Sequence, residues 1–232
     1  MKNYQRLLII STTLICIGCC KKDSEPGCPE NYLGGISFSQ NEKIVPQYEI
    51  NDSLEFINET SNNSILYTFK FQVSDYFTQS ENKPDSNGNI ACLGNYYKTE
   101  VYITQFNDYP TNWIRIQISK PSPYDTTYKV NGLVISLSIP GDSIYMFEGQ
   151  YAFNEDSIFS YPHLPGPYVA QVYDTITIAG QFYHKVYLLK GFQHLFVPER
   201  ITQVLYSTSY GILSFSTNKN NVWLIKNGRI LH

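Results

Sequence analysis

Short runs in which apolar and polar side chains alternate recur along this chain, and they limit its fold more than any other feature. Residues 65–73, 113–119 and 133–139 each carry an aliphatic or aromatic side chain at every second position. Successive side chains of a β-strand point to opposite faces, so these runs predict strands with one buried and one wetter face. After residue 20, no segment has an apolar stripe at helical spacing. The sequence therefore predicts an all-β chain.

Each alternating run has one face that we expect to be buried. The side chains of these faces are Ile65, Tyr67, Phe69, Phe71 and Val73 in the first run, Ile114, Ile116 and Ile118 in the second, and Leu133, Ile135, Leu137 and Ile139 in the third.

Turn residues separate the runs at intervals typical of hairpins. Ala179 and Gly180 lie between two such runs, Tyr210 and Gly211 between the next two, and Asn227 and Gly228 suit a type I′ turn near the end of the chain. The last part of the chain therefore resembles a β-meander. We expect an antiparallel β-sandwich or a barrel-like meander, and strand order decides between them.

The first residues of the chain read as an export signal. Lys2 and Arg6 precede an apolar stretch over residues 7–18, which is too short to span a bilayer. The stretch ends in Gly18, Cys19 and Cys20, and a small residue before a Cys resembles the lipobox of bacterial lipoproteins. The resemblance implies that signal peptidase II cuts before Cys19, that the Cys19 thiol carries a diacylglycerol and that the new amino end is acylated. Cys20 is the alternative acceptor.

The resemblance also implies a destination. In that family, Asp after the lipidated Cys retains the protein in the inner membrane, whereas here Cys20 or Lys21 follows. We therefore expect an outer-membrane lipoprotein that faces the periplasm or the cell surface. Two or more acyl chains make such an attachment durable.

Composition and linkers suggest three segments. Residues 1–18 form the signal peptide, residues 19–35 are rich in Pro, Gly and charge and read as a tether, and residues 36–232 form a single all-β domain. The Pro-containing stretch 120–127 is a candidate subdomain boundary. A net charge of -3 gives nucleic-acid binding no electrostatic support.

Two cysteines remain in the body of the chain, Cys28 and Cys92. An exported protein folds in an oxidising compartment, where a lone pair of cysteines tends to form a disulfide. We therefore expect a Cys28–Cys92 bridge. Close Cys and His spacings typical of metal ligation are missing from the body of the chain, so we expect no metal site and no cofactor.

The sequence offers no catalytic constellation. Ser143 belongs to a Gly-Asp-Ser block that resembles the start of GDSL-type esterases, but no Asp lies three residues before any His, so the block reads as a β-turn. We interpret His184, in phase with apolar neighbours, as a hydrogen-bonded core residue. A hydrolase remains the alternative if folding gathers Asp174, Glu199 or His194 in one cleft.

Tyrosine is the residue type in excess, with 20 copies. Most of them fit the preference of Tyr for strands. Exposed Tyr in loops also suits contacts with sugars or proteins, because the side chain offers flat area and a hydroxyl. The candidate contacts are Tyr109, Tyr161 and Tyr168. The sequence thus favours a non-catalytic binding or interaction module with a carbohydrate or protein ligand.

Overall fold

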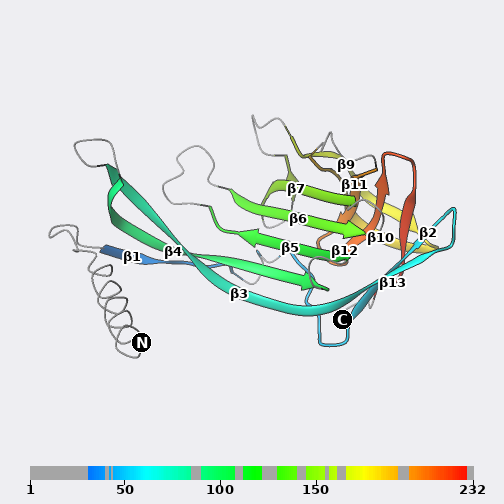
Figure 1. Ribbon diagram of the computed structural model, residues 1–232, viewed down its shortest axis with the longest axis horizontal. Helices are drawn as coiled ribbons and strands as arrows, with labels where there is room; N and C mark the ends of the chain where they lie inside the picture. Colours follow the sequence, from blue (N-terminus) through cyan, green and yellow to red (C-terminus); the bar gives the residue numbers. More distant parts are fainter. Residues whose placement is uncertain are drawn as a thin grey trace, which may run out of the picture.

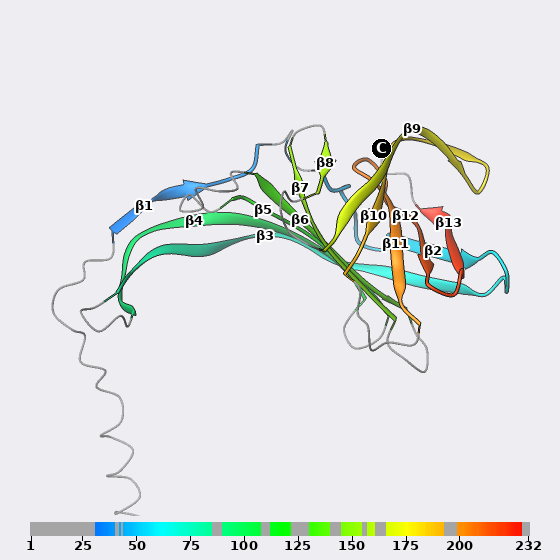
Figure 2. The same cartoon turned by 90° about the horizontal axis from the view of Figure 1, so that it is seen from above.

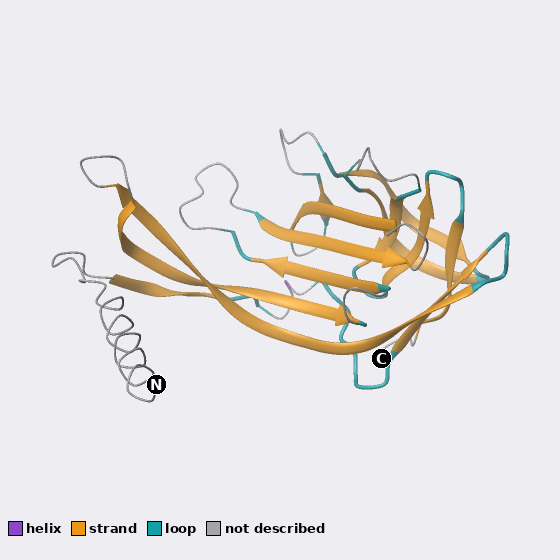
Figure 3. Ribbon diagram, in the orientation of Figure 1, coloured by secondary structure: helices purple, strands orange, loops and turns teal. Residues whose placement is uncertain are grey.

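The computed structural model describes residues 31–39, 42, 44–84, 90–107, 112–121, 130–139, 145–154, 157–160, 166–192 and 199–228. Strands dominate this part of the chain (Figure 3). They are β1 (Asn31–Ile36), β2 (Ser53–Asn58), β3 (Ser64–Pro84), β4 (Ile90–Phe106), β5 (Trp113–Ser119), β6 (Asn131–Ile139), β7 (Tyr145–Phe153), β8 (Ile158–Phe159), β9 (Tyr168–Ile178), β10 (Gln181–Lys190), β11 (Ile201–Ser207), β12 (Gly211–Thr217) and β13 (Val222–Gly228).

The strands form one nearly closed, barrel-like sheet (Figure 1). Strands β2 to β8 each pair with the next one along the chain, and so do β9 to β13. Strand β13 then pairs antiparallel with β2 and joins the two series. The sheet path ends at β8 and β9, which lie close together without a ladder between them. The prediction of an antiparallel all-β fold is confirmed, and the strand order makes it a barrel-like meander.

The alternating runs on β5 and β6 point into the barrel as predicted. Ile114, Ile116 and Ile118 of β5 are fully buried, and β6 buries the expected four aliphatic side chains. The hydroxyl of Tyr67 on β3 donates to the Ser138 carbonyl at 2.8 Å. Burying apolar area of this kind is the main favourable term in folding. Strands β5 and β6, which flank the stretch 120–127, pair with each other along their length.

The segment between β1 and β2 packs against the barrel core. Ile44, Val45 and Tyr48 are buried, and the hydroxyl of Tyr206 donates to the Ile44 carbonyl at 2.8 Å. The Tyr48 ring meets the Phe106 ring edge-on, with centroids 4.7 Å apart. This segment therefore belongs to the core although it has little regular structure.

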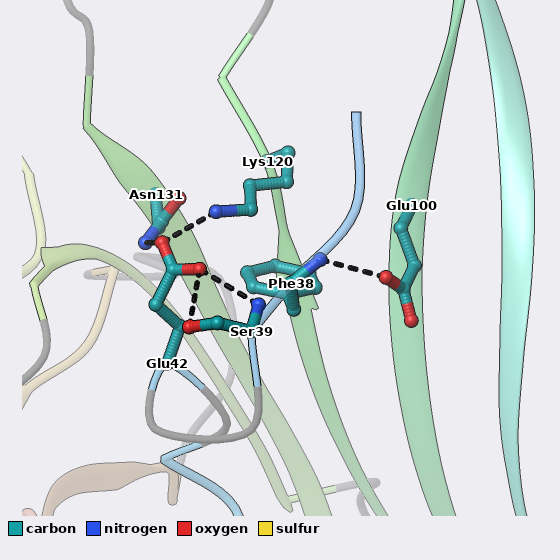
Figure 4. Close-up of polar contacts among 6 residues, drawn as sticks. All are labelled: Phe38, Ser39, Glu42, Glu100, Lys120 and Asn131. Atoms are coloured by element: carbon teal, nitrogen blue, oxygen red, sulfur yellow. Dashed lines mark hydrogen bonds and ion pairs between the residues drawn. The ribbon is translucent and has the colours of Figure 1, made fainter. Parts of the chain in front are cut away.

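A polar cluster fixes the start of that segment (Figure 4). Glu42 accepts hydrogen bonds from the Ser39 backbone N–H at 2.8 Å and the Ser39 hydroxyl at 2.9 Å, and it pairs with Lys120. The hydrogen bond from Lys120, followed by those from Ser39, lowers the pKa of Glu42 from 4.5 to about 2. Next to it, the Phe38 N–H donates to Glu100 at 2.7 Å. The cluster thereby ties the segment to β4 and to the end of β5.

Strands β3 and β4 extend well beyond the barrel as a curved hairpin (Figure 2). Strand β1 pairs with the outer part of β4 in parallel, starting with Asn31 opposite Asn95. We call β1, the outer part of β3 from Phe71 onward and the outer part of β4 up to Glu100 the arm. The last residues of the predicted tether, 31–35, thus form a strand of the arm. No helix in the described ranges is long and apolar enough to cross a membrane.

Two expected burial patterns fail where strands leave the barrel. Phe71 and Val73 are exposed, because the β3–β4 register shifts between Phe69 and Phe71 and the strand then projects into the arm. His184 is exposed and hydrogen-bonded to Thr175, whereas the neighbouring Tyr183 is buried, so His184 lies on the outward face of β10. The predicted hydrogen bond is present, but the predicted core position of His184 is wrong.

The turn predictions have mixed outcomes. Ala179 and Gly180 have positive φ angles of 48° and 81° and form the hairpin between β9 and β10, as predicted. Asn227 and Gly228 do not form a turn. They continue β13 and pair with Glu55 and Leu54 of β2, because closing the barrel gives this stretch a partner strand.

Candidate functional site

Tyr168 is the predicted contact residue that the structure places in a pocket. It is the first residue of β9 and its side chain is 50% exposed. The pocket has a volume of about 340 Å³. Its lining consists of Gly166, Tyr168, Lys190, Gly191, Phe192, Arg200 and Thr202. We call it the seam pocket, because it lies where the sheet path ends.

Three hydrogen bonds join the two edges of the sheet beside this pocket. The Val169 N–H donates to the Ser160 hydroxyl at 2.9 Å, just after β8. The Phe192 N–H donates to the Glu148 carbonyl of β7 at 2.8 Å. The Tyr151 hydroxyl donates to the Lys190 carbonyl at 2.9 Å. The seam is therefore held by single bonds in place of a ladder, and its edges position Tyr168 and Lys190.

Two glycines shape the lining. A Cβ on Gly166 would come within 2.8 Å of the Phe192 ring, and a Cβ on Gly191 would come within 2.6 Å of the Phe147 ring. Glycine at both places lets the Phe192 ring lie close to the backbone at residue 166 and lets β10 end against β7. The pocket thus presents two aromatic side chains, Tyr168 and Phe192, on a fixed backbone.

The seam pocket is lined by two basic side chains. Lys190 and Arg200 both line it, and the Lys190 ammonium donates to the Gln203 amide oxygen at 2.5 Å. The neighbouring carboxylate, Glu199, is held by the Thr217 hydroxyl at 2.8 Å and the Asn221 amide at 2.6 Å. Although the chain has a net charge of -3, two basic side chains therefore lie at the seam pocket.

This arrangement suits a flat, anionic ligand. Aromatic faces contact the apolar face of a sugar ring or another planar group, and ammonium and guanidinium groups form strong hydrogen bonds to carboxylates. Pockets of a few hundred Å³ with a few polar groups are the usual size and make-up of small-molecule sites.

The candidate hydrolytic residues do not form an acid–base pair among the described residues. Burial raises the pKa of Glu199, but hydrogen bonds from Asn221 and Thr217 and the charge of Lys219 outweigh it and hold the pKa below its ordinary value. A general acid needs the opposite shift. Asp174 lies exposed in β9, and His194 lies outside the described residues. No three His, Cys, Asp or Glu side chains gather within the described ranges.

Several predicted sites fall where the structure describes nothing. Cys19, Cys20 and Cys28 precede residue 31, and Tyr109 and Tyr161 fall in undescribed loops. Cys92 lies in β4 opposite Lys83, but its side chain is outside the description. The lipidation of Cys19 and the Cys28–Cys92 bridge stay predictions.

A second hollow of about 380 Å³ lies on β10 to β13. Leu188, Leu205, Ser214 and Leu224 occupy successive paired positions across these strands and line it, together with Tyr173 and Ile176 of β9. Its lining is mainly apolar, and its polar members, among them Glu59, Gln203 and Ser216, include no Lys or Arg, unlike the lining of the seam pocket.

Sequence reasoning missed Lys190 and Arg200. The pocket combines the starts of β9 and β11 with the end of β10, and these meet only once the barrel forms. The one local signal is that Lys190 precedes Gly191 at the end of an apolar run. No protein-family model matches the chain, and no curated protein and no solved structure matches it either.

Proposed function

We propose that this protein is a lipid-anchored binding module of the outer membrane or cell surface, and that its seam pocket binds an acidic oligosaccharide. The observation that carries the ligand is the joint placement of Tyr168, Lys190 and Arg200 around one pocket. An exposed aromatic ring contacts a sugar face, and two cations select a carboxylated sugar over a neutral one.

The anchor half of the proposal is supported by the lipobox-like residues around Cys19. Changing Cys19 to Ala removes the thiol that would carry the diacylglycerol, so labelling with a radioactive fatty acid should disappear and the protein should leave the membrane fraction. Labelling that persists in this variant would indicate that Cys20, and not Cys19, carries the lipid. A wild-type protein that takes up no label would overturn the anchor.

The ligand half is tested by calorimetric titration of the whole protein. Oligogalacturonate is the acidic probe, and a neutral glucose oligomer of equal length is its control. We expect binding of the acidic probe alone, and we expect Lys190→Gln to weaken it roughly 10- to 100-fold, because a hydrogen bond to a charged group is worth about 1.5–3 kcal/mol.

Matched variants separate the pocket from the rest of the surface. Tyr168→Ala removes the stacking ring, whereas Tyr76→Ala removes an equally exposed Tyr from the arm. Weaker binding in the first variant and unchanged binding in the second support the seam pocket. Equal binding of the neutral oligomer, or equal loss in both variants, contradicts it. Cleavage of the probe during the titration would instead favour a hydrolase.

A further inference from the structure

The arm carries an exposed apolar stripe on one of its faces. Phe71, Val73 and Phe77 are 45%, 42% and 50% exposed. They lie at alternate positions along β3 and therefore share a face, on which the exposed Asp75 stands between Val73 and Phe77. Across the ladder, Val73 pairs with Ile103 and Phe77 with Thr99, and both partners are buried, so the exposed stripe belongs to β3. We call this face, defined by Phe71, Val73 and Phe77, the outer face of the arm.

The opposite face has a different chemistry. Tyr76 shares a hydrogen bond of 3.1 Å with the Ser37 hydroxyl, and Ser74 donates to Glu100 at 2.5 Å. The Tyr32 ring of β1 packs against the Tyr96 ring of β4, with centroids 5.4 Å apart. This face is thus engaged by hydroxyls and rings of the chain itself, whereas the outer face exposes the apolar side chains of Phe71, Val73 and Phe77 together with Asp75.

The chain enters the described structure through the arm. Strand β1 begins at Asn31, opposite Asn95 in the outer part of β4 (Figure 2). About 12 residues separate Cys19 from Asn31, and at roughly 3.3–3.6 Å each they span at most about 40 Å. Lipid attached to Cys19 would therefore hold the arm, before any other part of the described chain, close to a bilayer.

We infer that the outer face of the arm docks on the lipid surface to which the chain is anchored, so that Phe71, Val73 and Phe77 enter the interface between headgroups and acyl chains. This inference rests on the lipid anchor proposed above. Tethering raises the effective concentration of the bilayer around the arm, so a few apolar side chains suffice for docking. Aromatic side chains are favoured at that depth. Docking would also orient the barrel, with its seam pocket, relative to the membrane.

The test uses the lipidated protein in vesicles of phosphatidylethanolamine and phosphatidylglycerol, with and without bromine on the acyl chains. The chain has two Trp, and both belong to barrel strands, Trp113 in β5 and Trp223 in β13. Phe77→Trp adds a fluorescent reporter to the outer face. Thr78→Trp adds one to the neighbouring position, which points to the opposite face.

We expect brominated lipid to quench the emission added by Phe77→Trp and to leave that added by Thr78→Trp largely unchanged. Equal quenching at both positions, or none at either while the protein floats with the vesicles, overturns the docking and leaves the anchor intact. In the second case, cross-linking between copies through the arm would identify a second copy of this chain as what covers the face. Protein that does not float with the vesicles overturns the anchor, and the docking with it.

Discussion

The alternating run 65–73 of β3 crosses from the barrel into the arm, and its two parts have opposite surroundings. Residues 64–69 alternate as barrel residues should, with Ile65, Tyr67 and Phe69 buried. The alternation of residue types continues through Val73 and is broken at Asp75, and from Phe71 onward both faces of the strand contact solvent. Residues 64–68 pair with β2, whereas Phe69 and the outer half pair with β4. An alternating run thus specifies a strand, whereas burial of its apolar face depends on a second layer that only the barrel half has.

A small irregularity separates the two halves. The β3–β4 register shifts between Phe69 and Phe71, so that Lys70 is left outside the regular pairing. Such a bulge moves the following side chains to the other face. Phe71 and Val73 therefore do not continue the face formed by Tyr67 and Phe69, and they lie on the outer face of the arm.

The largest difference in stability is expected between substitutions of two phenylalanines on either side of this bulge. Phe69→Ala should destabilise the protein by about 3–5 kcal/mol, because it empties a site between the Tyr48 and Phe106 rings. Phe71→Ala should change stability by about 0.5 kcal/mol or less, since its side chain is 45% exposed. Urea titration followed by circular dichroism measures both. Similar losses in the two variants would mean that the arm is packed like the barrel.

The next comparison concerns two tyrosine hydroxyls on the same strand. Tyr67→Phe leaves the buried Ser138 carbonyl without the donor that now lies at 2.8 Å, which should destabilise the protein by about 1–3 kcal/mol. Tyr76→Phe removes an exposed hydrogen bond to Ser37 and should have almost no effect. Urea titration measures both variants. A larger loss of stability for Tyr76→Phe than for Tyr67→Phe would contradict the buried environment of Tyr67 and the exposed environment of Tyr76.

A third prediction concerns the ion pair where arm and barrel meet. The pKa of Glu42 is lowered to about 2 from its ordinary 4.5. A lowered pKa contributes stability above pH 4.5 that is lost as the pH falls toward 2. Glu42→Gln should therefore cost about 1–2 kcal/mol at neutral pH, given the partial exposure of the pair, and flatten the acid dependence.

Thermal melts between neutral and acid pH measure this effect. Glu199, whose pKa is also lowered, contributes in the same direction and should leave a residual acid dependence in the variant. An acid dependence in Glu42→Gln as steep as in the wild type would show that the pair with Lys120 does not stabilise the junction.

The smallest expected effect is that of Phe77→Ser in the absence of vesicles. Phe77 is 50% exposed, so its replacement should shift the free energy of unfolding by no more than about 0.5 kcal/mol. A clear loss of stability, measured by the same urea titration, would indicate that Phe77 packs against the protein and is not available to lipid.

The sequence pattern correctly predicted those elements of the fold that depend on residues close in sequence. The period-2 runs of β5 and β6 and the Ala179–Gly180 hairpin are specified by residues close in sequence, and all three are present. Non-local features were not predictable in this way. Asn227 and Gly228 join a strand because β2 lies beside them, and His184 is exposed because its neighbour Tyr183 occupies the inward face of β10. Tyr168 could be proposed from its type, but its cationic neighbours meet only across the seam.

The claim that one strand serves two environments is tested most directly by hydroxyl-radical footprinting of the aromatic side chains of β3, first in solution and then on vesicles. In solution, Tyr67 and Phe69 should resist oxidation, and Phe71, Tyr76 and Phe77 should react. On vesicles, Phe71 and Phe77 should become protected while Tyr168 of the seam pocket stays reactive. Protection of Phe71 and Phe77 already in solution, equal to that of Tyr67, would contradict the account.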